Sequence, residues 1–263
     1  MELVLSLYGM SLAVDTGVGV LDRVVAVLDA VEDGAGTFSA IVATTGLPRS
    51  TVHRLLRAMD AHGLVTEPGD GVYRLGPRLL RLASNAAADL PLRDIARPAL
   101  EDLARHTGES AQLYVRARDA RICVDAVESE RELRTIVSVG AALPLTAGSA
   151  GKVFLAWASS DRERDRLIAA AVPLTPSTPT GDRLRREVAA VRRVGYASSG
   201  SERQEGVGSV SAPVLGPDGT LLAVVSVSGP SARLGREGAA AYADAVIEAA
   251  DAIGTALAGA SGA

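Results

Sequence analysis

The sequence has little of what metal and redox chemistry requires. It contains one cysteine, Cys123, and three histidines, His53, His62 and His106, among 263 residues. One cysteine cannot form an internal disulfide, a CxxC redox pair or a multi-cysteine zinc site, and the histidines lack the spacing of metal ligands. Because all three histidines lie before Glu109, from which the strands of the C-terminal part are predicted to begin, we expect no Cys-His or Ser-His catalytic pair within that strand-containing part. We therefore expect no catalytic residue, no metal site and no cofactor.

A large charge of one sign and a long apolar run are also missing. The 27 Lys and Arg residues face 31 Asp and Glu residues, a formal net charge of -4, which argues against a protein that coats nucleic acid with its whole surface. The apolar N-terminal stretch ends at Asp15. It is therefore shorter than a membrane span, which needs about 20 residues. Acidic residues interrupt the other apolar stretch, residues 239–260, and indicate a surface helix. We expect a cytoplasmic protein with no membrane partner and a loose tail over residues 1–16, with Met10 as an alternative start.

Residues 17–76 are predicted to form a winged helix-turn-helix domain. Apolar residues from Leu21 to Val31 recur at helical spacing. Thr37 is a suitable N-cap for a short second helix, and Pro48 suits the first turn of a third helix. Glycine and proline then separate two short apolar segments, which is typical of a hairpin. Helices are predicted over 18–32, 38–45 and 48–62, and hairpin strands over 64–66 and 72–75.

The third predicted helix has one apolar face and one basic face. Between residues 48 and 81, six arginines oppose three acidic residues, so this segment carries +3 and the rest of the chain -7. A local basic surface on an acidic protein suits phosphate neutralisation at one face. The alternative is an ordinary solvated helix surface. The residues predicted to contact double-stranded DNA are Arg49, Ser50, Thr51, His53, Arg54 and Arg57 on the helix, and Arg74 on the wing.

The remaining chain is predicted to contain a linker helix over 77–90 and an effector-binding and oligomerisation domain over 91–260. A further helix extends to His106, with a kink or a new start at Pro98. Strands and helices mix along this part, which favours an α/β domain on a mostly antiparallel sheet and an α+β protein as a whole. Strands are predicted at 112–115, 122–124, 136–139, 207–215 and 221–228, and helices at 148–158, 161–170 and 182–194.

Two patterns in the C-terminal part suggest a ligand site. The small residues Gly148 to Gly151 lie at a predicted helix N-terminus, where free N-H groups and the helix dipole favour a carboxylate. Close packing is the alternative explanation for the small residues. The segment fails as a P-loop, because Thr146 and Val153 replace residues that this motif needs. Serines alternate at period two on two strands and place hydroxyls on one face, either toward a ligand or toward solvent: Ser209, Ser211, Ser226 and Ser228.

The sequence resembles the IclR family of transcriptional regulators over nearly the whole chain after Gly17. The resemblance rests on residues 38–57 of the helix-turn-helix and on Tyr73-Arg74-Leu75-Gly76. It continues through Thr107-Gly108-Glu109-Ser110, through 147–152 and 205–214, and ends at 225–230. The branch that it resembles most is an actinobacterial one linked to amino-acid metabolism.

This resemblance implies a DNA-binding regulator whose operator binding is modulated by a small carboxylate or amino-acid-like effector. It implies a GAF/profilin-like effector domain and a homodimer or homotetramer on a palindromic operator. Ser209 stands where acid-binding members often have a cysteine, and the polar group of the preceding segment is Glu202 or Ser199. The implied effector contacts are Leu143, Gly148, Ser149, Ala150, Glu202, Val207, Ser209, Ser226 and Ser228.

Two alternatives stay open on the residues alone. One is a small-molecule enzyme with a fused winged helix, in which Cys123 or Lys152 is the nucleophile. Against it, Cys123 lies in an apolar strand pattern that favours a buried, inert thiol. The other alternative is a DNA-binding protein without a ligand, whose C-terminal domain only dimerises.

Overall fold

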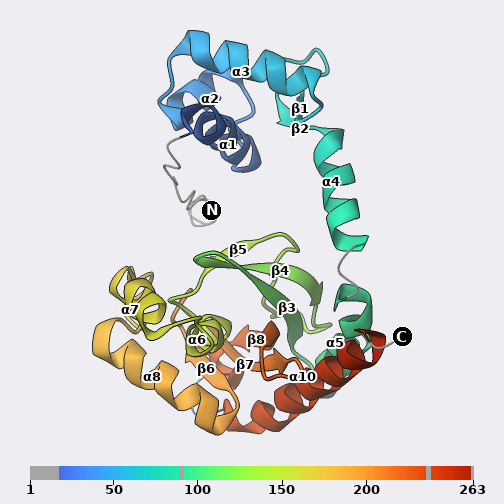
Figure 1. Ribbon diagram of the computed structural model, residues 1–263, viewed down its shortest axis with the longest axis vertical. Coiled ribbons are helices and arrows are strands. Elements are labelled where there is room, and N and C mark those ends of the chain that lie inside the picture. The colour runs from blue at the N-terminus through green and yellow to red at the C-terminus, as the bar shows by residue number, and fades with distance from the viewer. Residues whose placement is uncertain (1–17, 89–91, 235–237, 262–263) are drawn as a thin grey trace. The chain divides into compact units, whose positions relative to one another are not determined.

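The computed structural model describes residues 18–88, 92–234 and 238–261. The chain divides into two compact units, Met1–Leu90 and Pro91–Ala263 (Figure 1). The tail predicted over 1–16 and the alternative start Met10 lie outside the described residues. Within the described ranges, every helix is too short or too polar to cross a membrane.

The N-terminal unit is a helix-turn-helix followed by a short antiparallel hairpin, as predicted. Thr37 Oγ1 accepts from the Ala40 amide at the start of the second helix, and Gly46 ends that helix with a φ of +64°. The apolar faces of the helices enclose a small core that includes Val27, Ile41 and Leu56. The elements are α1 (Gly19–Glu32), α2 (Phe38–Thr45), α3 (Arg49–Ala61), β1 (Val65–Thr66), β2 (Arg74–Leu75) and α4 (Pro77–Ala88).

The C-terminal unit contains a six-stranded sheet in the order β5-β4-β3-β8-β7-β6. Each strand pairing in it is antiparallel. The long β7 and β8 form a central hairpin, and β3 joins β8 although more than 100 residues separate them in sequence. The strands are β3 (Ser110–Ala117), β4 (Ala120–Val127), β5 (Ala142–Pro144), β6 (Ala197–Gly200), β7 (Val207–Leu215) and β8 (Leu221–Pro230).

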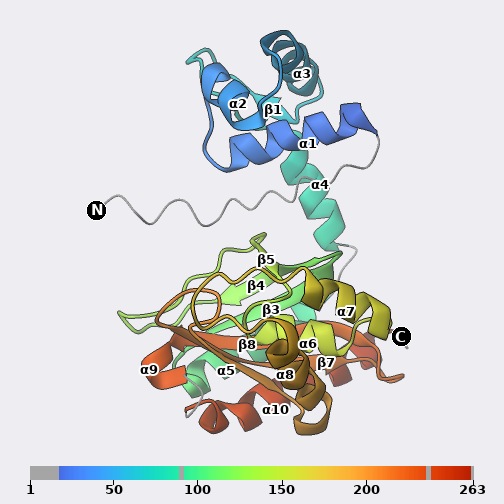
Figure 2. The same ribbon diagram turned by 90° about the vertical axis from the view of Figure 1, so that its left-hand side faces the viewer.

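Helices cover both faces of this sheet and produce two apolar cores. Figure 2 shows α5 and α10 under one face, with α6, α7 and α8 toward the other. Side chains alternate along β7, so that Val210 and Ala212 pack in the core with α5 and α10 while Ser209 and Ser211 face α6. The helices are α5 (Leu92–Thr107), α6 (Ser149–Ala156), α7 (Asp161–Ala169), α8 (Gly181–Val194), α9 (Ser231–Leu234) and α10 (Ala240–Ser261).

The predicted strand over 136–139 is wrong. These residues form a loop between β4 and β5, and β5 takes the edge position beside β4. The apolar alternation there reflects one inward side chain, Val137, between exposed Ile136 and Val139. Sequence reasoning also missed β6, because Ala-Ser-Ser-Gly contains none of the β-branched or aromatic residues that favour strands. Pro98 lies inside α5 without ending it.

Candidate functional site

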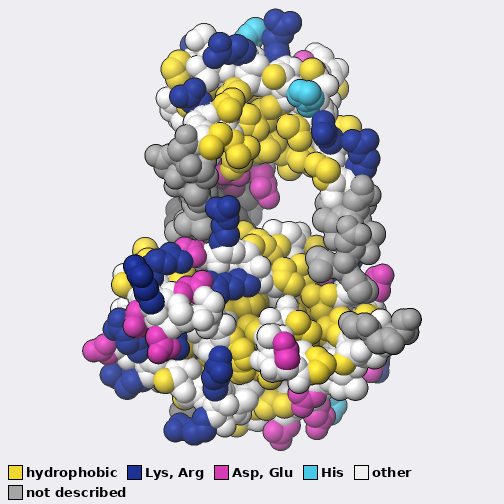
Figure 3. Space-filling model, in the orientation of Figure 1, with side chains coloured by type: hydrophobic (Ala, Val, Ile, Leu, Met, Phe, Trp, Pro, Cys, Tyr) yellow, Lys and Arg dark blue, Asp and Glu magenta, His cyan; other side chains and the backbone are white. Residues whose placement is uncertain are grey.

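One face of α3 is basic and exposed in the N-terminal unit. Arg49, Arg54 and Arg57 are exposed, together with Ser50 and His53, while Thr51 is half-buried. The opposite face of the helix buries Val52, Leu56 and Met59 in the core. Figure 3 shows basic side chains and a histidine gathered over α3. Since the core fixes the rotation of α3, the basic face is presented outward as one surface.

An aromatic contact that the sequence analysis missed orders part of this surface. The Arg49 guanidinium carbon lies 4.9 Å from the centre of the Phe38 ring. The His53 ring meets the same phenyl group edge-on, with 6.4 Å between ring centres. Because the cation-π contact restricts the long Arg49 side chain, less conformational entropy is lost when that guanidinium binds a partner.

Arg74 lies on the wing, as predicted, but it is engaged with a neighbouring carboxylate. Its guanidinium donates to Asp70 at 2.6 and 3.2 Å. This hydrogen bond holds the pKa of Asp70 below its usual range. A phosphate contact by Arg74 therefore requires exchange of one anionic partner for another.

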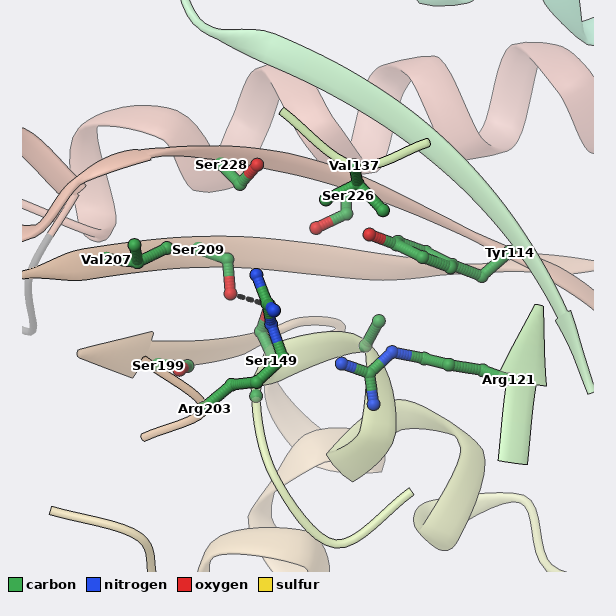
Figure 4. Close-up of a pocket in the computed structure, with 12 residues that line it drawn as sticks. Tyr114, Arg121, Val137, Ser149, Ser199, Arg203, Val207, Ser209, Ser226 and Ser228 are labelled. Atoms are coloured by element: carbon green, nitrogen blue, oxygen red, sulfur yellow. Dashed lines mark hydrogen bonds between the residues drawn. The ribbon is translucent and has the colours of Figure 1, made fainter. Parts of the chain in front are cut away.

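A cavity lies between α6 and the β7-β8 hairpin in the C-terminal unit. Its empty space is about 380 Å³ with the open mouth included. Of the residues implied by the family resemblance, Leu143 and Glu202 do not line it. Leu143 packs in the apolar core instead. The lining residues are Tyr114, Arg121, Val137, Gly148, Ser149, Ala150, Ser199, Arg203, Val207, Ser209, Ser226 and Ser228 (Figure 4).

The start of α6 forms one wall of the cavity. Gly148 is the N-cap with a φ of +86° and provides no side-chain cap, so the first turn of α6 keeps amide donors for another partner. Gly151 has a different role, because a Cβ there would collide with the Leu145 carbonyl. Close packing therefore explains Gly151, while the ligand explanation for the start of the segment stays a prediction.

Sequence reasoning missed Tyr114, Arg121 and Arg203 as lining residues, and Arg121 is the buried charge among them. Its side chain extends from β4, is 3% exposed and stacks 5.5 Å from the centre of the Tyr114 ring. One terminal nitrogen donates to the carbonyls of Ala147, at 3.0 Å, and Pro144. Its Nε has no hydrogen-bond partner among the described residues. Burial lowers the pKa of Arg121 to about 10, so the guanidinium stays charged at neutral pH and favours an anion.

A buried ion pair beside the cavity holds the N-terminus of α6 in place. Lys152, the single lysine of the chain, donates to Glu202 at 2.5 Å, to Glu187 at 2.6 Å and to the Ser198 carbonyl at 2.8 Å. The second oxygen of Glu202 accepts from the Gly148 amide at 3.2 Å. Burial raises the pKa of Glu202, while Lys152 opposes the shift. Glu202 thus positions the N-terminus of α6.

The geometry does not support Cys123 or Lys152 as the nucleophile of the enzyme alternative. The three donor positions of Lys152 are each engaged. Cys123 is completely buried, and burial raises the pKa of its thiol to about 12. A protonated and inaccessible thiol is inert at neutral pH. In the part of the chain that the structure describes, we find no group of three or more His, Cys, Asp or Glu side chains that could hold a metal ion.

Comparison with known proteins identifies both units. The family model described as the IclR helix-turn-helix domain matches residues 20–69, and that of the IclR C-terminal domain of bacterial transcriptional regulators matches residues 84–255. Regulator Rv1719 of Mycobacterium tuberculosis is 34% identical over 84% of this chain and 86% of its own length. The glycerol operon regulatory protein of Streptomyces griseus is 36% identical over 77% and 80%.

A solved structure of an IclR homologue has the same fold as this chain. An IclR homologue of Microbacterium hydrocarbonoxydans, complexed with 4-hydroxybenzoate, is 29% identical and covers 90% of this chain and 98% of its own, with a TM-score of 0.78. The matched families and the curated relatives are transcriptional regulators and not enzymes. The chain belongs to the IclR family and is a DNA-binding transcriptional regulator.

Proposed function

We propose that α3 enters the major groove of a palindromic operator and that a small carboxylate in the cavity modulates this binding. The exposed arginines of α3 support the first part, because guanidinium groups suit both phosphates and guanine edges. A regulator of this kind acts where the DNA is, so we place it in the cytoplasm. Its membership of an amino-acid branch stays a prediction.

The buried Arg121 guanidinium is the observation that supports an anionic effector. A charge that is 3% exposed and has an unpartnered Nε is costly unless an anion joins it. Arg203 lines the same cavity and has no carboxylate partner among the described side chains. The amides at the start of α6 favour negative charge at the same place. The homologue complexed with 4-hydroxybenzoate binds a carboxylate, in agreement with this class.

We expect Arg203→Gln to weaken carboxylate binding about 10- to 100-fold, because it removes a charge-assisted hydrogen bond from the cavity. Arg203 is the better test than Arg121, whose bonds to Pro144 and Ala147 also support the fold. Calorimetry with acetate, pyruvate and 4-hydroxybenzoate measures the change. The protein bound to a DNA site selected from random sequence is then titrated with the same acids.

Arg186→Gln is the matched control, since it removes the same charge from the exposed surface of α8. It should leave both carboxylate affinity and operator affinity unchanged. Equal weakening by both substitutions, or carboxylates that bind without any effect on operator affinity, would contradict the proposed effector site.

We also propose that two or four copies assemble. The face of α1 that includes Leu21 and Val25 is apolar yet 53% and 45% exposed, and Figure 3 shows hydrophobic side chains gathered below α3 in this unit. On α4, Leu80 is 73% exposed. Apolar patches of this kind commonly mark contacts between proteins.

Light scattering should therefore give a mass of about twice or four times 26.9 kDa. We expect Leu21→Glu/Leu80→Glu to shift the assembly toward smaller species, because the new charges would be buried in the contact. The isolated double variant should keep its helical content by circular dichroism. A wild-type mass of one chain at micromolar concentration would refute the assembly.

A further inference from the structure

Four serine hydroxyls form a hydrogen-bonded ladder beside the cavity, and a fifth serine, Ser228, lies next to it. Ser149 of α6 lies 2.6 Å from both Ser209 and Ser211 of β7, measured between the Oγ atoms. Ser211 lies 2.8 Å from Ser226 of β8. Ser228, the last of the set, lies opposite Ser209 in the β7-β8 register. Figure 4 shows the hydroxyl of Ser209 directed toward Ser149, on the side where Arg203 lies.

The backbone fixes the direction of the protons in this ladder. Ser226 is placed to donate to the carbonyl oxygens of Val210, at 3.3 Å, and Val227, at 3.5 Å. A carbonyl only accepts and a serine has one proton, so Ser226 must accept from Ser211. By the same argument, Ser149 donates to Ser211. Ser209 then donates to Ser149, so the protons of these four hydroxyls are all used within the ladder or by the backbone.

Ser209 and Ser228 therefore both offer a lone pair, and no proton, to a ligand. Ser209 has donated its proton to Ser149. Ser228 donates its proton to the side-chain oxygen of Gln112 at 3.1 Å. A ligand atom beside Ser209 and Ser228 must be a hydrogen-bond donor, because an acceptor there would meet lone pairs. Carbonyl and ether oxygens are thus disfavoured at this position.

The charge of the cavity decides which kind of donor fits. Arg121 and Arg203 line the cavity, and among its described lining residues there is no carboxylate to accompany an ammonium group. The nearby Glu202 is held by Lys152 and the Gly148 amide. A neutral hydroxyl can donate to Ser209 or Ser228 without repulsion from the two guanidinium groups.

We propose that the cavity selects hydroxy acids: the carboxylate binds the guanidinium and α6 side, and a ligand hydroxyl donates to Ser209 or Ser228. This inference rests on the proposed carboxylate site and names its ligand class. It distinguishes hydroxy acids from the keto, amino and unsubstituted acids of the same carbon skeleton.

Calorimetry with matched acids tests this selection. The probes are lactate, pyruvate, propionate and alanine, and the same four with a phenyl group on carbon 3. In at least one set, we expect the hydroxy acid to bind about tenfold more tightly than the unsubstituted acid. The keto and amino acids should bind no better than the unsubstituted acid.

Substitutions of the serines test whether the ladder causes the preference for hydroxy acids. Ser209→Ala/Ser228→Ala should reduce the hydroxy preference to about one, because the acceptors for the ligand hydroxyl are lost. Ser198→Ala is the control, because Ser198 pairs with Val210 on the face of the sheet away from the cavity. In Ser211→Ala, Ser149 loses one acceptor and can donate to Ser209 instead. The proton of Ser209 is then free to reach a ligand in the cavity. The keto acid should then gain affinity relative to the hydroxy acid.

The outcomes separate this inference from the site on which it rests. If the four acids of each set bind equally, or if the amino acid binds best, the carboxylate site stands and hydroxy selection is overturned. If Ser211→Ala weakens all acids to the same degree, the proton direction is overturned. If no carboxylate binds a protein that still binds its operator, both the effector class and the hydroxy selection fail.

Discussion

Replacing Arg49 and Arg54 together by alanine should weaken operator binding about 100-fold or more. Both side chains are exposed on the outward face of α3, and Arg49 is held over Phe38. A guanidinium that reads a base contributes about 1–3 kcal/mol of discrimination. One that neutralises a phosphate contributes about 0.9 to the slope of log affinity against log salt. Binding titrations on a selected site at several salt concentrations measure both effects.

Arg193→Ala provides the matched control, because it removes one exposed arginine from α8 in the other unit. Its operator affinity and salt slope should equal those of the wild type. The sites retained by the wild type should show two-fold symmetry and be lost with the double variant. Retention of the same sites by both proteins would show that the α3 face does not recognise DNA.

Lys152→Met should destabilise the C-terminal unit by about 3–5 kcal/mol. Lys152 and Glu202 are 3% and 2% exposed, and removal of one partner of a buried ion pair leaves the other charge uncompensated. For a unit of this size, the melting temperature should fall by about 10 °C. Calorimetric melting of the full chain measures this loss.

The pH dependence of this variant follows from Glu202. Burial already raises the pKa of Glu202, and Lys152 lowers it, so the substitution should raise the pKa further. A carboxyl with a raised pKa in the folded state contributes stability below its unfolded pKa and loses it as the pH rises through the folded pKa. The stability difference from wild type should therefore be smaller at pH 5 than at pH 8.

Lys152→Met/Glu202→Gln is the compensating variant. It removes both charges of the pair and should recover a large part of the lost stability, because a neutral amide costs less to bury than an isolated carboxylate. If the double variant is as unstable as Lys152→Met, the loss arises from packing and not from charge.

The helix-turn-helix was predictable because its signals are local. The helix predicted over 38–45 agrees with α2 at both ends, since Thr37 and Gly46 provide caps on either side. The apolar spacing of the third helix predicts that Val52, Leu55, Leu56 and Met59 are buried and the arginines exposed; in α3 this holds except for Leu55, which is half-buried. The strand predicted at 136–139 failed because alternation within four residues also fits a loop with one buried side chain, Val137.

By itself, the sequence determined the family, the winged helix, the basic face of α3 and the small residues at the start of α6. These follow from spacing within a few turns of chain. Only the tertiary structure placed Arg121, Tyr114 and Arg203 around those small residues and joined the serines of α6, β7 and β8 into one ladder. The reason is that strand pairing and helix packing bring together residues far apart in sequence. Burial then gives an arginine or a serine a charge environment and a proton direction that its neighbours in the chain do not encode.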